Sequence, residues 1–172
     1  MINLHTACLL AEYKEWADQQ MFTSLAELPR EEVVRERQSV FKNMVGTLNH
    51  IYAVDRIWQA HLQGQTHPYK TSHETSHAEL NDLQLAQGEL NRWFRDWTQD
   101  QSDESLTHPV DFTFLSGAPG VMSAGAMLLH VVNHASYHRG WICQMYFEIP
   151  ARPPFTDLPV FLRDVHQEFP GR

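Results

Sequence analysis

Three histidines recur at four-residue steps in one segment of this chain, and histidine is the side chain most often used to bind transition metals. They are His130, His134 and His138, among eleven histidines in 172 residues. Successive i, i+4 positions drift by about 40° around a helix, so neighbouring members of the series can converge on one ion. The outer two lie about 80° apart and would converge less well. Two of the three are therefore candidate ligands, and a third ligand must come from elsewhere.

His50 is the candidate for that third ligand. It lies in line with Thr47, Val54 and Ile57 on the expected inward face of another helix, although a histidine there is also typical of a hydrogen-bonded core residue. Three neutral imidazoles would suit Zn²⁺ or Ni²⁺ best, with Fe²⁺, Co²⁺ or Mn²⁺ as further candidates, and would leave a coordination position open. An ion held without an anionic ligand could bring the pKa of bound water to about 7 or hold a thiol as thiolate.

A second histidine pair, His73 and His77, stands in the sequence His-Glu-Thr-Ser-His, which matches the HExxH motif of zinc proteases. That motif needs both histidines on one face of a helix, with the glutamate beside the metal. Ser76 is expected to cap a helix here, which leaves His73 in the preceding loop, and no third ligand follows. Glu74 to His77 is also the one Glu-x-x-His sequence in the chain, so a ferritin-like di-iron centre is not expected.

Four long helices are expected to position these histidines. Apolar residues recur at three- and four-residue steps over residues 4–28, 40–62, 77–99 and 124–149. Ser76 with Glu79 matches a capping box, and Ser123 can cap the fourth helix. The connections over residues 64–76 and 100–120 are long, with extended chain or a small strand at residues 111–115, and residues 158–169 form a short amphipathic segment. The pattern predicts an all-α four-helix bundle with long crossover connections and a short C-terminal helix, as a single domain over residues 1–172.

Composition excludes several other classes of protein. Hydrophobic residues make up 42% and charged residues 20%, with 8 Gly and 9 Pro, which excludes disordered and collagen-like chains. The net charge of −8 without a basic stripe argues against a nucleic-acid partner. Because no apolar run approaches 20 residues and no signal peptide is visible, we expect no membrane contact and a cytoplasmic location. Cys8 and Cys143 stand alone among apolar neighbours, as reduced, packed thiols do.

The segments around the candidate ligands resemble the DinB/YfiT-like family of damage-inducible metalloproteins. The similarity is carried by Thr-Leu-Asn-His-Ile at residues 47–51 and Asn-His-Ala-Ser-Tyr-His-Arg-Gly at residues 133–140, and it extends to residues 13–17, 55–58 and 156–158. It implies a four-helix bundle whose metal is held by one histidine of the second helix and an HxxxH pair of the fourth. Those positions are His50, His134 and His138, which leaves His130 as a core or outer-sphere residue.

The family resemblance also implies a class of chemistry. Members of known activity are mostly thiol transferases or isomerases that use a low-molecular-weight thiol at the metal. The implied function is a metal-dependent thiol S-transferase, with a small thiol and an electrophile as partners. Cys8 and Cys143 have no visible cationic neighbour to activate them, so the thiol would arrive as a cofactor. Relatives commonly have Gln where this chain has Trp141, so the role of that Gln is missing or passes to Gln144.

Two other functions compete with the transferase, and the sequence also bears on the oligomeric state. A metal-dependent hydrolase would use the same ion, but the helical stripes offer no clear carboxylate as general base. A non-catalytic, metal-binding stress-response protein would need only the ligands. A homodimer is expected because relatives often pair and because Trp58, Trp93 and Trp97 lie near the edges of helical stripes.

Overall fold

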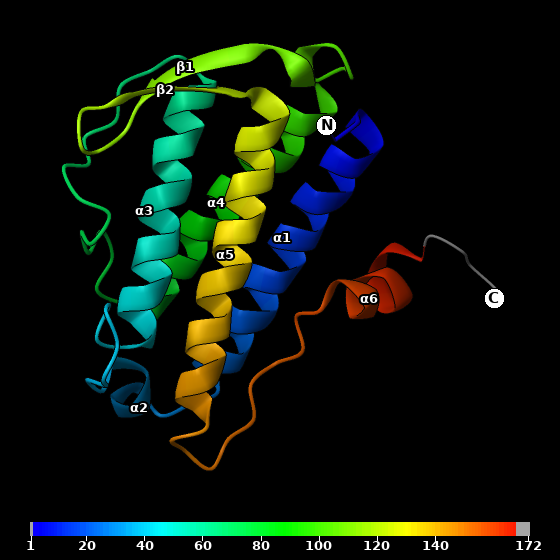
Figure 1. Ribbon diagram of the computed structural model, residues 1–172. Helices are drawn as coiled ribbons and strands as arrows, with labels where there is room; N and C mark the ends of the chain where they lie inside the picture. Colours follow the sequence, from blue (N-terminus) through cyan, green and yellow to red (C-terminus); the bar gives the residue numbers. More distant parts are fainter. Residues whose placement is uncertain (1, 168–172) are drawn as a thin grey trace.

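The computed structural model describes residues 2–167, which form four long helices packed side by side with a small hairpin across one end (Figure 1). The long helices are α1 (Leu4–Ala26), α3 (Met44–Leu62), α4 (Leu80–Gln99) and α5 (Ala124–Tyr146). The short elements are α2 (Arg30–Val34), a 3₁₀ turn (Ser105–Thr107), β1 (Pro109–Thr113), β2 (Pro119–Ser123), α6 (Leu158–Phe161) and a π turn (Leu162–His166). The predicted all-α four-helix bundle is confirmed, with the hairpin as an addition.

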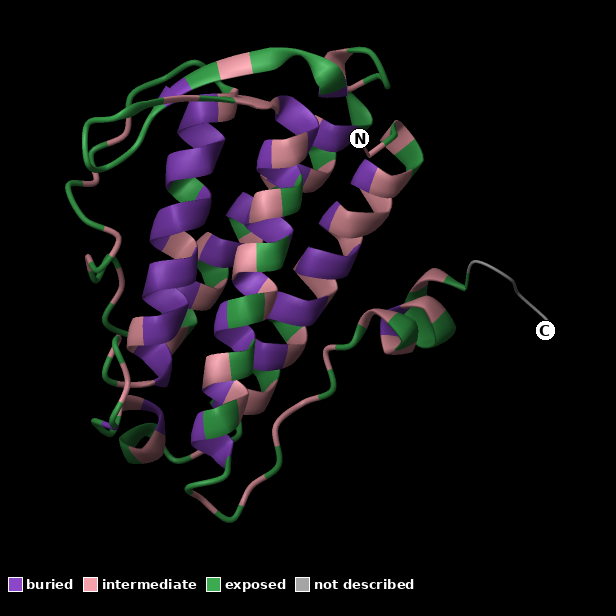
Figure 2. Cartoon of the chain, in the orientation of Figure 1, coloured by how far each residue is buried: buried purple, intermediate pink, exposed green. Residues whose placement is uncertain are grey.

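The core lies between the inward faces of the four long helices. Figure 2 shows the buried positions along these faces and the exposed positions on the outside. α1 packs against α4 and α5, while α3 packs against α5 and α4. Met21, Leu48, Phe94 and Met127 are each at most 3% exposed, and they come from the four different helices. No described helix is long and apolar enough to cross a membrane.

The helix that carries His50 begins later than the apolar pattern predicts. α3 starts at Met44 rather than at residue 40, because Lys42 adopts a left-handed conformation (φ 67°) that ends the preceding turn. Asn43 then caps the helix by accepting a 2.7 Å hydrogen bond from the amide of Gly46. A Cβ at Gly46 would overlap the carbonyl of Phe41, so this tight entry requires glycine.

The expected capping box of Ser76 and Glu79 was wrong. α4 begins at Leu80, and Glu79 makes no side-chain capping hydrogen bond. The reason lies on α3, where Asn49 binds both backbone groups of His77. The His77 amide donates to Asn49 Oδ1 (2.9 Å), and Asn49 Nδ2 donates to the His77 carbonyl (2.8 Å). These bonds occupy the backbone groups with which His77 would join a helical turn.

The cap of α5 is as predicted, and it should be measurable. Ser123 Oγ accepts a hydrogen bond from the amide of Ala126 (3.3 Å). We expect Ser123→Ala to lower the free energy of unfolding by about 1 kcal/mol, because an N-cap hydroxyl satisfies an otherwise unpaired amide. Urea unfolding followed by circular dichroism measures the change. Ser76→Ala is the matched control and should change stability by less than about 0.5 kcal/mol; equal losses in both variants would contradict the cap assignment.

The connection predicted to hold a small strand folds as a hairpin, and the C-terminal segment returns to α1. β1 pairs antiparallel with β2, from Pro109 opposite Ser123 to Thr113 opposite Pro119. The second strand was not predicted, because Pro119 and Gly120 are poor strand formers. Within the expected C-terminal helix, α6 and the π turn cover residues 158–166, and residues 168 and 169 lie outside the described part. The Tyr13 hydroxyl donates to the Thr156 carbonyl (2.8 Å) and fixes this segment.

Four charged side chains from three helices meet inside the bundle, and we call them the buried ion network. Lys14 Nζ of α1 lies 2.8 Å from Asp18 and 2.7 Å from Asp55 of α3. Arg139 of α5 completes the network at 2.7 Å from the other oxygen of Asp18, and Asn91 of α4 accepts from Lys14 (2.7 Å). The charged side chains are at most 3% exposed. Two positive and two negative charges balance one another.

The network shifts the pKa values of its members. Burial opposes ionisation of Asp18, but the charges of Lys14 and Arg139 outweigh it and lower the pKa of Asp18. Burial also disfavours the charged form of Lys14, yet its two carboxylate neighbours raise the Lys14 pKa. For Asp55, burial prevails over the attraction of Lys14 and raises the pKa to about 6. Asp18 is therefore the carboxylate on which the two cations converge.

Candidate metal centre

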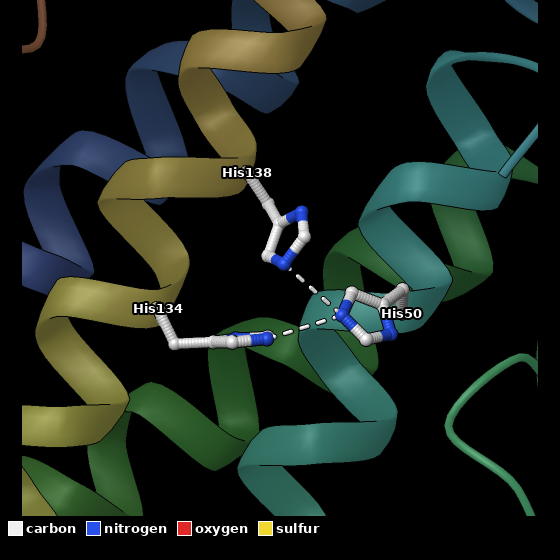
Figure 3. A group of neighbouring side chains, drawn as sticks. All are labelled: His50, His134 and His138. Atoms are coloured by element: carbon white, nitrogen blue, oxygen red, sulfur yellow. Dashed lines mark hydrogen bonds between the residues drawn. The ribbon is translucent and has the colours of Figure 1, made fainter. Parts of the chain in front are cut away.

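The structure brings His50, His134 and His138 together between α3 and α5. His50 projects from α3, while His134 and His138 project from successive turns of α5 toward it (Figure 3). His50 Nε2 lies 3.1 Å from His134 Nε2 and 3.1 Å from His138 Nε2. The potential ligand atoms of the three residues lie within 4.8 Å of one another, and no other such group occurs among the described residues.

The orientation and charge of these rings suit metal binding. His50 Nδ1 lies 2.8 Å from the Ser72 carbonyl, which makes Nδ1 the donor and leaves a lone pair on Nε2. Burial lowers the pKa of His50. Burial, followed by the charges of His138 and His50, lowers the pKa of His134 to about 2, and burial and His50 lower that of His138 to about 4. All three imidazoles are therefore neutral near pH 7, the form that binds a metal.

The spacing of the nitrogens supports the same conclusion. Tetrahedral ligands at the usual zinc–nitrogen distance lie about 3.4 Å apart, close to the 3.1 Å found here. His134 Nδ1 and His138 Nδ1 are buried and have no hydrogen-bond partner within the described residues. The Nδ1 atoms of His134 and His138 are thus shielded from solvent, while their Nε2 atoms point toward His50 Nε2. The triad is compatible with binding a divalent transition ion.

An aromatic layer lies against the triad. Phe41, from the turn before α3, stacks on His50 with ring centres 4.0 Å apart and planes 16° apart. Trp141 of α5 lies 4.8 Å from the His138 ring and 5.7 Å from Phe41. Trp141 occupies the position where the family resemblance predicts Gln, so an indole replaces an amide beside the triad. Gln144, the suggested replacement, is exposed.

The other predicted histidines lie around the triad without joining it. His130 is 5.6 Å from His134 by ring centres, and its nearest aromatic neighbour is Trp58 at 4.8 Å. His73 and His77 lie in the α3–α4 loop (residues 63–79), outside any helix, so they do not form the helical pair of a zinc protease. Glu74, the remaining residue of that motif, accepts hydrogen bonds from the amides of Lys70 and Thr71.

Cys143 is poorly placed to act as a nucleophile. Cys8 and Cys143 are half-buried and form no disulfide in the described part of the chain. The expectation that Cys143 has no cationic neighbour was wrong, because Arg139 acts on it, but burial outweighs that charge and raises the pKa of the thiol. A raised pKa leaves little thiolate near neutral pH.

Three contributors to the site were not predicted from the sequence. Phe41 and Ser72 lie in irregular segments, where no periodicity marks them as neighbours of His50. Asn49 gave a signal that could have been used, because a buried amide inside an apolar helix needs hydrogen-bond partners. It is 1% exposed and finds those partners in the α3–α4 loop.

Comparison with known proteins agrees with this fold. The chain matches the DinB family over residues 1–168. Protein DinB of Bacillus subtilis (strain 168) is 33% identical over 162 residues, which cover 89% of this chain and 91% of that protein. A crystal structure of a DinB-like protein from Bacillus cereus ATCC 10987 superposes with a TM-score of 0.62 at 18% identity, covering 84% of this chain and 91% of the other, and so shows a shared fold. The chain belongs to the DinB family.

Proposed function

We propose that this protein binds one divalent transition ion, Zn²⁺ or Ni²⁺ in preference, through His50, His134 and His138, and that it is a metal-dependent thiol S-transferase. The observation that carries the proposal is the convergence of three neutral imidazoles on one point, with no carboxylate in the ligand group. Three neutral ligands leave the positive charge of an ion undiminished and a coordination position free.

The chain itself supplies orientation and shielding. A bound divalent ion supplies acidity, lowering the pKa of a thiol so that thiolate predominates near neutral pH. Ser72 holds the His50 ring in one tautomer, and Phe41 stacks on that ring. In the transfer, the thiol proton passes to solvent, the sulfur forms a bond to an electrophilic carbon, and the leaving group departs with the electron pair of the broken bond.

Two alternative functions are less well supported. Hydrolysis would need a general base beside the triad, and Glu74, the acidic residue of the HExxH segment, instead binds backbone amides of its own loop. A non-catalytic metal-binding role needs no partner molecule. It predicts that thiols leave the spectrum of the metal centre unchanged.

Cobalt substitution tests the thiol proposal directly. We expect glutathione, bacillithiol or mycothiol to produce a sulfur-to-cobalt charge-transfer band in the Co²⁺-loaded protein, because thiolate is a preferred ligand of such ions. The band should persist in the Cys8→Ser/Cys143→Ser variant, which excludes the protein's own thiols as its source. If none of the three thiols changes the spectrum, the transferase proposal fails and the non-catalytic role replaces it.

We also propose that the protein forms a homodimer. Trp58 is 8% exposed and packs inside the core, so it cannot serve the interface as expected. Trp93 and Trp97 of α4 remain partly exposed and stack on each other, and Leu85 on the same helix is 71% exposed. Bulky apolar groups on one helix suit an interface between two copies. Light scattering at micromolar concentration should give about twice the 20.0 kDa chain mass, and the mass of a single chain would contradict the proposal.

A further inference from the structure

Three aromatic side chains border the triad on one side, and we call Phe41, Tyr137 and Trp141 the aromatic collar. Trp141 lies 5.7 Å from Phe41 and 5.3 Å from Tyr137 by ring centres. Each member also contacts the His138 ring, at 5.5, 5.0 and 4.8 Å for Phe41, Tyr137 and Trp141. The collar therefore contacts the triad at His138, one of the three proposed metal ligands.

The collar lies between His138 and solvent. Tyr137 is 59% exposed, and Phe41 and Trp141 are half-buried, whereas His138 behind them is 6% exposed. Phe94 of α4, by contrast, is 1% exposed and lies within the core. Solvent-exposed aromatic rings that come from two separate segments and lie beside a group of polar side chains are typical of a small-molecule site.

The charged residues beside the collar in sequence are engaged elsewhere. Arg139, between Tyr137 and Trp141, points into the buried ion network and binds Asp18. Lys42, which follows Phe41, pairs with Glu36 at 3.6 Å. Arg139 therefore has no charge to offer a ligand, and the charge of Lys42 lies in solvent, so the collar itself presents ring faces and edges. Such surfaces favour a neutral, planar ring through offset or edge-to-face stacking.

We infer that the collar binds an aromatic group of the electrophile, so that the substrates of the proposed transferase are aryl or arylmethyl compounds. This inference rests on the proposed function, since the electrophile is defined by it. The collar residues form no bond in the transfer and act as specificity-determining residues. Their contact with the His138 ring places a stacked substrate beside the point where the three imidazoles converge.

Binding of size-matched alcohols tests the collar without any reaction. Saturation-transfer NMR with the zinc-loaded protein would compare benzyl alcohol with cyclohexylmethanol, which differ in the aromatic ring and little in size. We expect benzyl alcohol to bind about threefold to tenfold more tightly, the ratio that a good aromatic contact supports. Equal affinities for the two alcohols would overturn the inference.

Variants assign the preference to the collar. Trp141→Leu and Tyr137→Leu should each reduce the preference to less than about twofold, since leucine keeps apolar volume but has no ring face. Tyr137 is largely exposed, so its variant folds even if the Trp141 change perturbs the core. Trp97→Leu is the matched control, because it removes a tryptophan that stacks on Trp93 away from the triad. A preference retained in both collar variants would overturn the inference.

The thiol titration of the Co²⁺-loaded protein separates this inference from the proposed function. If glutathione, bacillithiol or mycothiol gives the charge-transfer band while the two alcohols bind equally, thiol binding stands and the collar inference fails. If none of the three thiols gives the band while benzyl alcohol keeps its Trp141-dependent preference, the collar stands as an aromatic-binding site and the transferase proposal fails.

Discussion

Replacing His134 by alanine is expected to lower the affinity of the protein for Zn²⁺ by more than about a hundredfold, because the loss of an outer-sphere partner alone already costs tenfold to a hundredfold. His134 Nε2 lies 3.1 Å from His50 Nε2, and its pKa of about 2 keeps it neutral and free to bind. His50→Ala and His138→Ala should cause losses of the same size. Competition with a chromophoric chelator gives the affinity, and elemental analysis gives the metal content per chain.

Three histidines serve as controls for this prediction. His73→Ala, His77→Ala and His130→Ala should keep about one ion per chain, because none of these residues belongs to the group of converging ligand atoms among the described residues. Loss of zinc in His77→Ala equal to that in His134→Ala would move the site to the HExxH segment. A metal–nitrogen distance near 2.1 Å at His130 would likewise replace the proposed ligand set.

Replacing Asp18 by alanine is expected to lower the free energy of unfolding by about 3–5 kcal/mol, because the change leaves buried cations without their partner. Asp18 is 3% exposed and binds Lys14 with one oxygen and Arg139 with the other. Asp55, whose pKa burial raises to about 6, cannot take over both cations, since it contacts Lys14 and not Arg139. Urea unfolding at pH 7 measures the loss.

An exposed ion pair provides the control for Asp18. Arg30 and Glu79 lie 2.7 Å apart, but their side chains are 68% and 56% exposed. Glu79→Ala should leave the urea midpoint nearly unchanged, because water screens the pair and hydrates either partner alone. Similar losses in the two variants would show that burial does not set the strength of these pairs.

Helix periodicity predicted the bundle well, because buried apolar residues recur at three- and four-residue steps along α1, α3, α4 and α5. It failed at helix starts that depend on other parts of the chain. The apolar stripe of α3 continues back to Val40, yet a left-handed residue at Lys42 stops the helix. α2 was missed because it has five residues, too few to show a period.

The sequence also predicted which histidines meet, but only in part from physical reasoning. Spacing alone left His130 and His138 as alternative partners of His134, and the family resemblance decided between them. Both histidines face α3, but His138 lies level with His50, whereas His130 lies about two turns earlier on α5 and contacts Trp58, about two turns later on α3. Phe41 and Ser72 could not be predicted, since their contacts with His50 depend on the path of two irregular loops.

Neighbouring side chains of α3 hold the α3–α4 loop at two points, His50 at the carbonyl of Ser72 and Asn49 at the backbone of His77. The four residues 73–76 therefore bridge two fixed anchors, while residues 63–71 connect the helix end to the first anchor. An insertion before Ser72 would lengthen a mostly exposed segment and leave the His50 ring in place. An insertion between the anchors would have to bulge outward or release one of them. Over evolution, variation in loop length should collect ahead of Ser72, and the spacing from Ser72 to His77 should stay constant.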